Sequence, residues 1–214
     1  MKTRLLIVDD HPLVRRGLTA ALTASIDLEV VAEASDADEA VSKARTVKPD
    51  IVILDISLPG KNGLEVLKQL QAEMPRVKVL ILSAFPEKQY AIRCLSNGAK
   101  GYLTKQHASD EIVEAIRKVA SGGKYVSPAL ADLLADEIGS KRTGLPHEQL
   151  SDREFQVLCL IGRGQTVSEV ARTLSLSLST VNTHRAHILE KMRMDTNAQL
   201  VRYVLDNNLV ESPH

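Results

Sequence analysis

Two patterns of hydrophobic and polar positions alternate along the first 121 residues. Short uninterrupted apolar runs are each followed by a stretch in which apolar residues recur every three or four positions. The runs predict strands that are buried on both faces, and the periodic stretches predict amphipathic helices. Strands are expected at residues 5–8, 28–34, 51–54, 77–83 and 101–104, and helices at about 12–22, 37–46, 62–73, 88–97 and 109–121. Five such units predict a doubly wound, flavodoxin-like α/β domain with a five-stranded parallel sheet.

Beyond residue 123 the strand pattern stops. Residues 124–148 hold one expected short helix, at 128–138, and a run at 139–146 with the composition of a linker. Residues 149–214 show only helical periodicity, with helices expected at about 152–163, 166–174, 179–192 and 197–207. Two short helices, a tight turn and a longer third helix are typical of a helix-turn-helix. We therefore predict three parts: an α/β domain at 1–123, a linker at 124–148 and a small all-α domain at 149–214.

Composition and charge narrow the classes of protein. The 214 residues carry 27 basic and 27 acidic side chains, and the balance is even by region, with 17 and 16 at 1–123 and seven of each at 149–214. Overall charge therefore predicts no bulk attachment to nucleic acid or membrane. No apolar run is long enough for a spanning helix, and the N-terminus begins with charge followed directly by a strand, which argues against a signal peptide, so a cytoplasmic protein is expected. Cys94 and Cys159 lack CxxC spacing and are interpreted as small buried thiols.

Three carboxylates stand at the ends of two expected strands. Asp9 and Asp10 follow the first strand and Asp55 follows the third. Ligands of open α/β sheets bind beyond the carboxyl ends of strands, so these acids converge on one small volume if the two strands are neighbours. Two unit charges about 4 Å apart repel by roughly 4 kcal/mol at an effective dielectric near 20, which calls for a proton or a cation. Oxygen ligands favour Mg²⁺, and a free carboxylate beside this ion is suited to phosphoryl chemistry.

These motifs, in this order, resemble a known family. Residues 1–121 look like the receiver domain of a two-component response regulator, and residues 149–208 resemble the LuxR-type helix-turn-helix, which together match the NarL/FixJ family over nearly the whole length. The resemblance implies that Asp55 accepts a phosphoryl group. It implies that Asp9, Asp10 and Asp55 hold Mg²⁺ through side chains, or Asp9 through water, together with the backbone carbonyl of Ser57.

The resemblance assigns three further residues around this site. Ser83 and Lys105, at the ends of the fourth and fifth strands, would contact oxygens of the phosphoryl group. Tyr102 stands at the position of the family's switch aromatic and would fill the space that Ser83 vacates on phosphorylation. A buried aromatic without a switching role is the alternative for Tyr102. Many receivers have proline after the active-site lysine, and this chain has Gln106, which leaves only the local backbone geometry in question.

The third helix of the second domain is the candidate recognition helix. Asn182, Thr183 and Ala186 lie near its N-terminal end on one face, where an amide and methyl groups can read base edges. The side chains better placed for phosphates are Thr180, Arg185 and Lys191. The family's usual basic residue after Thr-Val is replaced by Asn182, and its Leu-Gly-Val after the helix by 192–194 (Met-Arg-Met). With so few basic side chains a monomer should bind DNA weakly, so dimerisation is expected to restore affinity.

Two features of this domain have alternatives. His184 and His187, three residues apart, suit a metal site poorly because no third ligand is evident, and His184 is expected to pack or contact backbone. The apolar stripe of the last helix either forms a dimer interface, as in the family, or closes the small core; its residues are Leu200, Val201, Val204 and Leu205.

The resulting hypothesis is a phosphorylation-controlled transcriptional regulator. A sensor histidine kinase or a small phosphodonor would phosphorylate Asp55 with Mg²⁺, and the protein would dimerise on double-stranded promoter DNA without a membrane partner. Its output is DNA binding, so we do not class it as an enzyme, although the receiver promotes its own phosphotransfer and dephosphorylation. An aspartyl-phosphate phosphatase is disfavoured because Ser57 replaces the second acid two residues after the nucleophile. A non-phosphorylated adaptor on the receiver scaffold usually lacks an acid or the lysine, and none is missing here.

Overall fold

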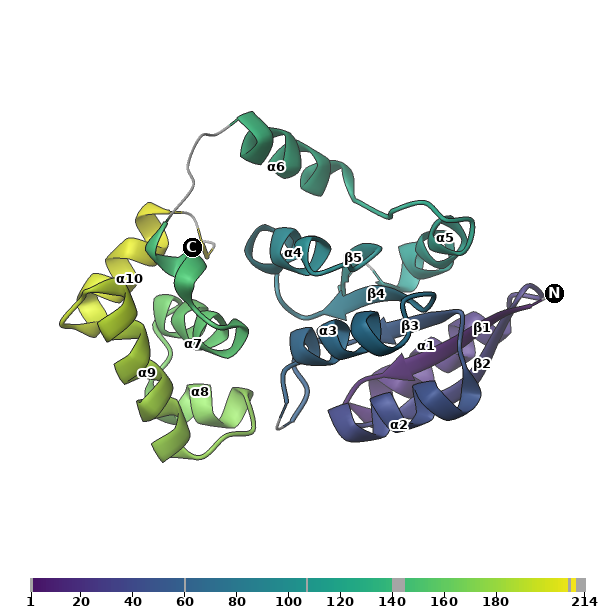
Figure 1. The fold of residues 1–214 in the computed structure, drawn as a ribbon, viewed down its shortest axis with the longest axis horizontal. Helices are drawn as coiled ribbons and strands as arrows, with labels where there is room; N and C mark the ends of the chain where they lie inside the picture. The colour runs from purple at the N-terminus through teal and green to yellow at the C-terminus, as the bar shows by residue number, and fades with distance from the viewer. Residues whose placement is uncertain (1, 60, 107, 140–144, 208, 211–214) are drawn as a thin grey trace. The chain divides into compact units, whose positions relative to one another are not determined.

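The computed structural model describes residues 2–59, 61–106, 108–139, 145–207 and 209–210. The chain divides into two compact units, Met1–Asp132 and Leu133–His214 (Figure 1). The division falls within helix α6 (Pro128–Gly139). Within the described ranges, no helix combines the length and the apolar character needed to cross a membrane.

The first unit is a five-stranded parallel sheet with a helix after each strand. The sheet order is β2-β1-β3-β4-β5, as in flavodoxin-like folds, which confirms the predicted fold class. The strands are β1 Thr3–Val8, β2 Leu28–Ala34, β3 Ile51–Leu54, β4 Lys78–Ser83 and β5 Gly101–Thr104. The helices are α1 Pro12–Thr23, α2 Ala37–Val47, α3 Gly63–Glu73, α4 Glu87–Ser96 and α5 Ala108–Ala120. Each strand and helix begins within two residues of its predicted start.

Both faces of this sheet are covered, which is why its strands are apolar at successive positions rather than alternately. On one face the strand residues pack with α1 and α5 in a single hydrophobic cluster. This cluster includes Leu5 and Ile7 of β1, Ile51 and Ile53 of β3, and Ile112 and Ile116 of α5. The alternate strand residues point to the opposite face and are equally buried. Packing on both faces of the sheet therefore fixes the positions of the residues at the strand ends.

The second unit contains only helices in its described residues. It comprises the 3₁₀ turn η1 Pro146–Gln149, α7 Asp152–Gly162, α8 Val167–Thr173, α9 Leu178–Met192 and α10 Asn197–Asp206. Ser151 and Thr166 form the predicted capping boxes, and Thr196 forms a third with Gln199 that was not predicted. The turn η1 spans the predicted limit between linker and all-α domain, with only Gln149 beyond it, and residues 140–144 of the predicted linker lie outside the described residues.

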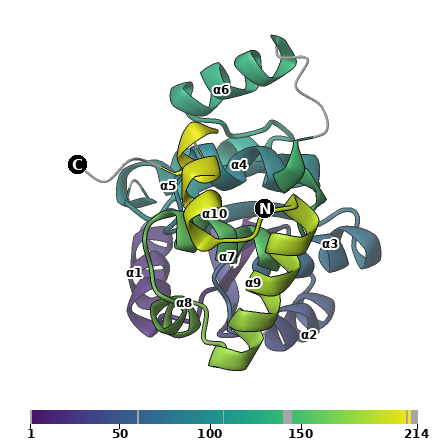
Figure 2. The ribbon, with the colours of Figure 1, turned by 90° about the vertical axis from the view of Figure 1, so that its left-hand side faces the viewer.

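Helices α8 and α9 form the predicted helix-turn-helix (Figure 2). Ser175 adopts a left-handed conformation with φ 52° between them, and Ser177 caps α9 by accepting a hydrogen bond from the Thr180 amide. The helix seats its Val181, Ile188 and Met192 side chains in the core. A tight turn therefore presents the opposite face of α9 to solvent.

Helix α10 closes this core against α7. Leu200 and Val204 are fully buried, and a Cβ added to Gly162 would lie 2.4 Å from a methyl group of Val204. The glycine thus allows the two helices to approach closely. Leu205 stays exposed on α10. The stripe on this helix therefore fills the core through two of its residues, and its role in dimerisation stays a prediction.

Candidate functional site

The strand order brings the predicted acidic residues together. β1 lies between β2 and β3, so the direction of chain progression reverses there, and such a switch point is where open α/β sheets bind ligands. Val8 and Leu54 are partners in the parallel register, and the Asp55 amide donates to the Val8 carbonyl at 2.9 Å. The Asp9 amide donates to the Ala34 carbonyl of β2 at 3.1 Å. Asp9 and Asp55 therefore leave adjacent strands at the same edge of the sheet.

Four side chains meet at this edge. Asp9, Asp10, His11 and Asp55 each present a potential ligand atom, and these atoms all lie within 4.8 Å of one another. Asp9 and Asp55 are each only 1% exposed. In the part of the chain that the structure describes, no second group of three or more His, Cys, Asp or Glu side chains is arranged in this way. Carboxylates so placed form a donor set that fits a divalent cation with a preference for oxygen ligands.

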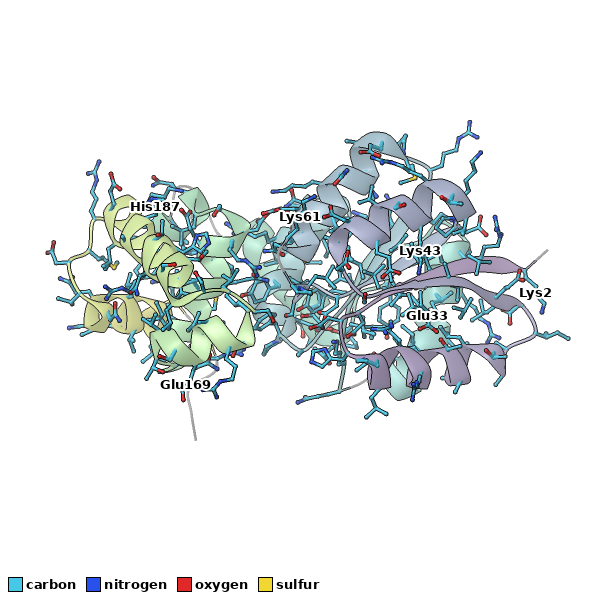
Figure 3. The ribbon with its side chains drawn as sticks, turned by 90° about the horizontal axis from the view of Figure 1, so that it is seen from below. Lys2, Glu33, Lys43, Lys61, Glu169 and His187 are labelled. Carbon is cyan, nitrogen blue, oxygen red and sulfur yellow. The ribbon has the colours of Figure 1, made fainter. Side chains whose placement is uncertain are left out.

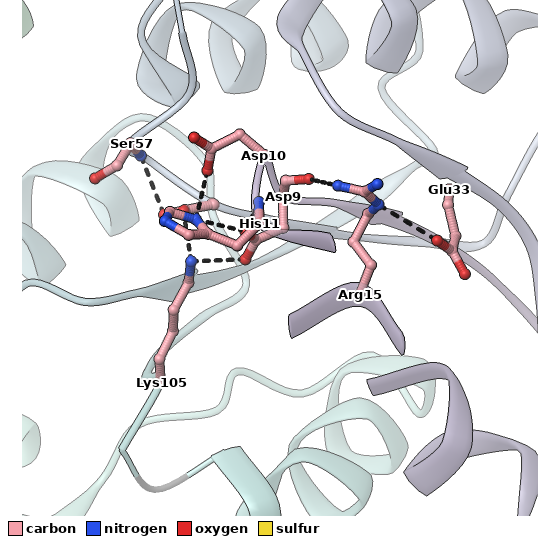
Figure 4. A network of polar contacts seen from close by, with 8 residues as sticks. Asp9, Asp10, His11, Arg15, Glu33, Ser57 and Lys105 are labelled. Atoms are coloured by element: carbon pink, nitrogen blue, oxygen red, sulfur yellow. Dashed lines mark hydrogen bonds and ion pairs between the residues drawn. The ribbon is translucent and has the colours of Figure 1, made fainter. Parts of the chain in front are cut away.

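Lys105 supplies a cationic group at the same edge. Its Nζ lies 2.6 Å from Oδ2 of Asp9 and 2.7 Å from Oδ2 of Asp55 (Figure 4). Burial alone would lower the pKa of Lys105, but the two carboxylates outweigh it and raise the pKa above its usual value. Lys105 is therefore held charged, as a ligand for an anionic group requires.

The environment of Asp55 disfavours the charged form of its carboxyl group. Burial raises its pKa, and the negative charge of Asp9 adds to the effect, while the charge and hydrogen bond of Lys105 lower it only in part. One ammonium group cannot neutralise two buried carboxylates, so the charged cluster keeps an excess of negative charge. This excess favours the binding of a further cation.

The loop after β3 holds Asp55 in position. The Ser57 amide donates to Oδ1 of Asp55 at 3.0 Å, and Asn62 caps α3 by accepting from the Leu64 amide at 2.9 Å. A Cβ added to Gly63 would lie 2.2 Å from the Asp55 carbonyl oxygen, so only glycine allows α3 to start this close to the strand. Ser57, whose carbonyl was predicted as a metal ligand, thus lies in the loop that carries Asp55.

Ser83 and Tyr102 lie deeper in the same unit. The Lys105 amide donates to the Ser83 carbonyl at 2.8 Å, which joins the ends of β4 and β5. The Ser83 hydroxyl accepts from the Phe85 amide at 3.1 Å, and the Tyr102 hydroxyl donates to the Phe85 carbonyl at 2.8 Å. Tyr102 is fully buried, and burial raises its pKa well above the usual value. The ring of Tyr102 is therefore already turned into the protein interior in this structure.

The sequence interpretation missed two residues that contact the cluster. His11 places Nδ1 at 2.6 Å from Oδ1 of Asp10 and 3.2 Å from Oδ1 of Asp9, and Arg15 donates to the Asp9 carbonyl at 2.6 Å (Figure 4). The only sequence signal for His11 is that it directly follows Asp10. Arg15 also reaches Glu33 on β2 at 3.3 Å, a long-range contact without a sequence signal.

The predicted base-reading residues share an exposed face of α9. Asn182, Thr183 and Ala186 are all exposed. Thr183 donates its hydroxyl to the Ser179 carbonyl one turn earlier at 3.0 Å, which leaves its methyl group for apolar contacts. Thr180 is partly buried, and its hydroxyl lies 2.7 Å from that of Ser177 at the start of the helix.

The two basic residues predicted for phosphate contact make interactions within their own unit. Lys191 lies 2.7 Å from a carboxylate oxygen of the buried Glu154 on α7, and Arg185 donates to Oδ1 of Asn197 at 3.3 Å. His187 also lies on α9 (Figure 3). Its Nδ1 is 3.6 Å from Oε1 of Glu154. Burial lowers the pKa of the neighbouring His184, in keeping with the predicted packing role.

Comparisons with known proteins match both units. The family model for the response regulator receiver domain matches residues 5–117, and that for bacterial regulatory proteins of the luxR family matches residues 148–204. The oxygen regulatory protein NreC of Staphylococcus aureus (strain MRSA252) is 37% identical over 215 residues, covering 97% of this chain and 99% of the relative. The response regulator GacA of Pseudomonas viridiflava is 37% identical over 210 residues, covering 98% of each. A crystal structure of a LuxR-family two-component response regulator from Aurantimonas sp. SI85-9A1 is similar with a TM-score of 0.61 and 34% identity, covering 65% of this chain and all of that one.

Proposed function

The chain belongs to the NarL/FixJ family of two-component response regulators, and on this premise we propose that Asp55 accepts a phosphoryl group from a sensor histidine kinase or a small phosphodonor. The observation that carries the proposal is the meeting of Asp9, Asp10, Asp55 and Lys105 at one edge of the sheet. A carboxylate oxygen of Asp55 would be the attacking atom, since the Ser57 amide fixes one oxygen of this group and Lys105 lies 2.7 Å from the other.

The cation proposed for the site is Mg²⁺. The side chains of Asp9, Asp10 and Asp55 and the carbonyl of Ser57 would hold it, and the excess negative charge of the cluster supports its binding. When bound, the ion screens the charge of the incoming phosphoryl group. The charged ammonium group of Lys105 would exchange its contact with Asp55 for one with a phosphoryl oxygen. The Ser83 hydroxyl would donate a hydrogen bond to a second phosphoryl oxygen.

The proposed switch concerns Ser83 and Tyr102. The hydrogen bonds of both side chains converge on the backbone of Phe85, just before α4. A phosphoryl group that draws the Ser83 hydroxyl away from the Phe85 amide would change the start of this helix. Because Tyr102 is already inward, the expected change is a shift of the β4–α4 loop around a fixed ring.

The proposed output is binding to double-stranded promoter DNA by a homodimer. Asn182, Thr183 and Ala186 would meet base edges, and Thr180, Arg185 and Lys191 would meet phosphates. To contact phosphates, Arg185 and Lys191 would have to give up or share their contacts with Asn197 and Glu154, so a monomer should bind DNA weakly. Two recognition helices in one dimer should bind DNA much more tightly. On this account the protein is cytoplasmic and is a regulator rather than an enzyme, and the limits 1–123, 124–148 and 149–214 serve as its proposed domains.

A selection of DNA sites tests the proposal. The full chain is incubated with random-sequence duplexes, with and without beryllofluoride and Mg²⁺, and bound sequences are recovered. We expect enrichment of a two-fold symmetric site only with beryllofluoride, together with a dimer in light scattering. Asn182→Ala should remove the sequence preference, and the exposed Glu29→Gln in the other unit serves as a control. Equal enrichment without beryllofluoride would contradict phosphorylation control.

A further inference from the structure

His11 lies on the exposed side of the acidic site and has no role in the proposed function. It precedes α1 as its N-cap residue, yet its side chain makes no capping hydrogen bond. Its amide instead donates to Oδ1 of Asp9 at 2.8 Å, which ties the backbone to the site. The imidazole ring is 63% exposed and directs Nδ1 at the carboxylates of Asp9 and Asp10 (Figure 4).

The ring is at ligand distance from the other donors. Two ligands at right angles around an ion with bonds near 2.1 Å are about 3 Å apart. Nδ1 of His11 lies 2.6 Å from Oδ1 of Asp10 and 3.2 Å from Oδ1 of Asp9. An ion bound between these carboxylates would therefore meet the imidazole nitrogen without a large movement of the chain. The neutral ring would then carry its proton on Nε2.

We propose that His11 is a further protein ligand of this site and biases it towards divalent ions that prefer nitrogen, such as Ni²⁺ and Co²⁺, over Mg²⁺. The inference rests on the metal site of the proposed function. Carboxylates and carbonyls suit Mg²⁺, whereas imidazole suits Ni²⁺ and related ions. A site with only oxygen ligands would lack this additional preference.

A different role for His11 predicts different binding. If the ring only contacts the carboxylates of Asp9 and Asp10, it competes with every ion for the same oxygens. Removing it would then strengthen the binding of Mg²⁺ and Ni²⁺ by the same factor. If the ring is a ligand, its removal weakens Ni²⁺ binding selectively.

Calorimetric titration of the full chain, without an affinity tag, with Mg²⁺, Co²⁺ and Ni²⁺ separates these roles. His11→Gln should weaken Ni²⁺ and Co²⁺ binding about tenfold or more and change the Mg²⁺ dissociation constant by less than about threefold. The visible absorption spectrum of the bound Co²⁺ should also shift. His187→Gln removes another exposed imidazole, far along the sequence, and should leave all three constants unchanged.

Two results would overturn the inference and are distinguishable from failure of the proposed function. Equal factors for Mg²⁺ and Ni²⁺, or an unchanged Co²⁺ spectrum, would show that His11 is not a ligand while the Mg²⁺ site stands. No binding of any ion to the unmodified chain would overturn the metal site itself, and the role of His11 with it. The circular dichroism spectrum of His11→Gln checks that the variant is folded.

Discussion

Replacing Asp55 by asparagine removes one of two buried carboxylates that share Lys105. The substitution loses the attraction across 2.7 Å, worth about 6 kcal/mol at an effective dielectric of 20. It also relieves repulsion from one neighbouring acid, Asp9, whose ligand atom lies within 4.8 Å, worth about 3.5 kcal/mol, and the cost of burying a charge, about 5 kcal/mol. The relieved terms exceed the lost attraction by about 2 kcal/mol. We therefore expect Asp55→Asn to stabilise the metal-free first unit by this amount.

Hydrogen exchange of the β3 amides measures this difference within the full chain. A stabilisation of about 2 kcal/mol slows their exchange about 30-fold if they exchange through opening of the whole unit. Mg²⁺ at ten times its dissociation constant should stabilise the unsubstituted protein by about 1.4 kcal/mol and the variant by less. The control Glu29→Gln neutralises an exposed carboxylate and should change stability by less than about 0.5 kcal/mol. Faster exchange in metal-free Asp55→Asn, or equal protection of both proteins by Mg²⁺, would refute the reasoning.

Three further predictions concern other parts of the chain. Lys105→Met should raise the affinity for Mg²⁺ about tenfold in calorimetry, because the ammonium group no longer competes for the carboxylates; a lower affinity would contradict this. Gly162→Ala should destabilise the second unit by about 1–3 kcal/mol, seen as faster exchange of α10 amides, because its Cβ would lie 2.4 Å from Val204. Lys43 lowers the pKa of Glu39 to about 2, so Glu39 stabilises the fold above its unfolded pKa and this stabilisation is lost as pH falls through 2. Thermal unfolding of Glu39→Gln should show a deficit under about 1 kcal/mol at pH 7 that disappears near pH 2.

Much of the fold could be predicted because local signals agreed with the final structure. Apolar runs became strands, and the Ser151 and Thr166 capping boxes began the helices that they predicted. The third box, at Thr196, was equally readable and was overlooked. The 3₁₀ turn η1 was missed because its four residues are too few for a periodic pattern.

The candidate site was predictable only up to the pairing of strands. The position of Asp55 at a strand end was clear from the sequence, but its proximity to Asp9 depended on β1 and β3 being neighbours, which sequence periodicity does not reveal. The pairing of Lys191 with Glu154 joins residues 37 positions apart and depends on how α9 packs on α7. Such contacts depend on tertiary packing. The prediction from the sequence therefore gave Lys191 a contact with a DNA phosphate and did not include its ion pair with Glu154.

Intact-mass spectrometry of the full chain after incubation with acetyl phosphate and Mg²⁺ tests the proposed phosphoryl transfer most directly. We predict that the unmodified protein gains one phosphoryl group, that peptide mapping locates it on Asp55, and that Asp55→Asn gains none. Undiminished labelling of Asp55→Asn, or a phosphoryl group mapped to another residue of the unmodified protein, would contradict the account.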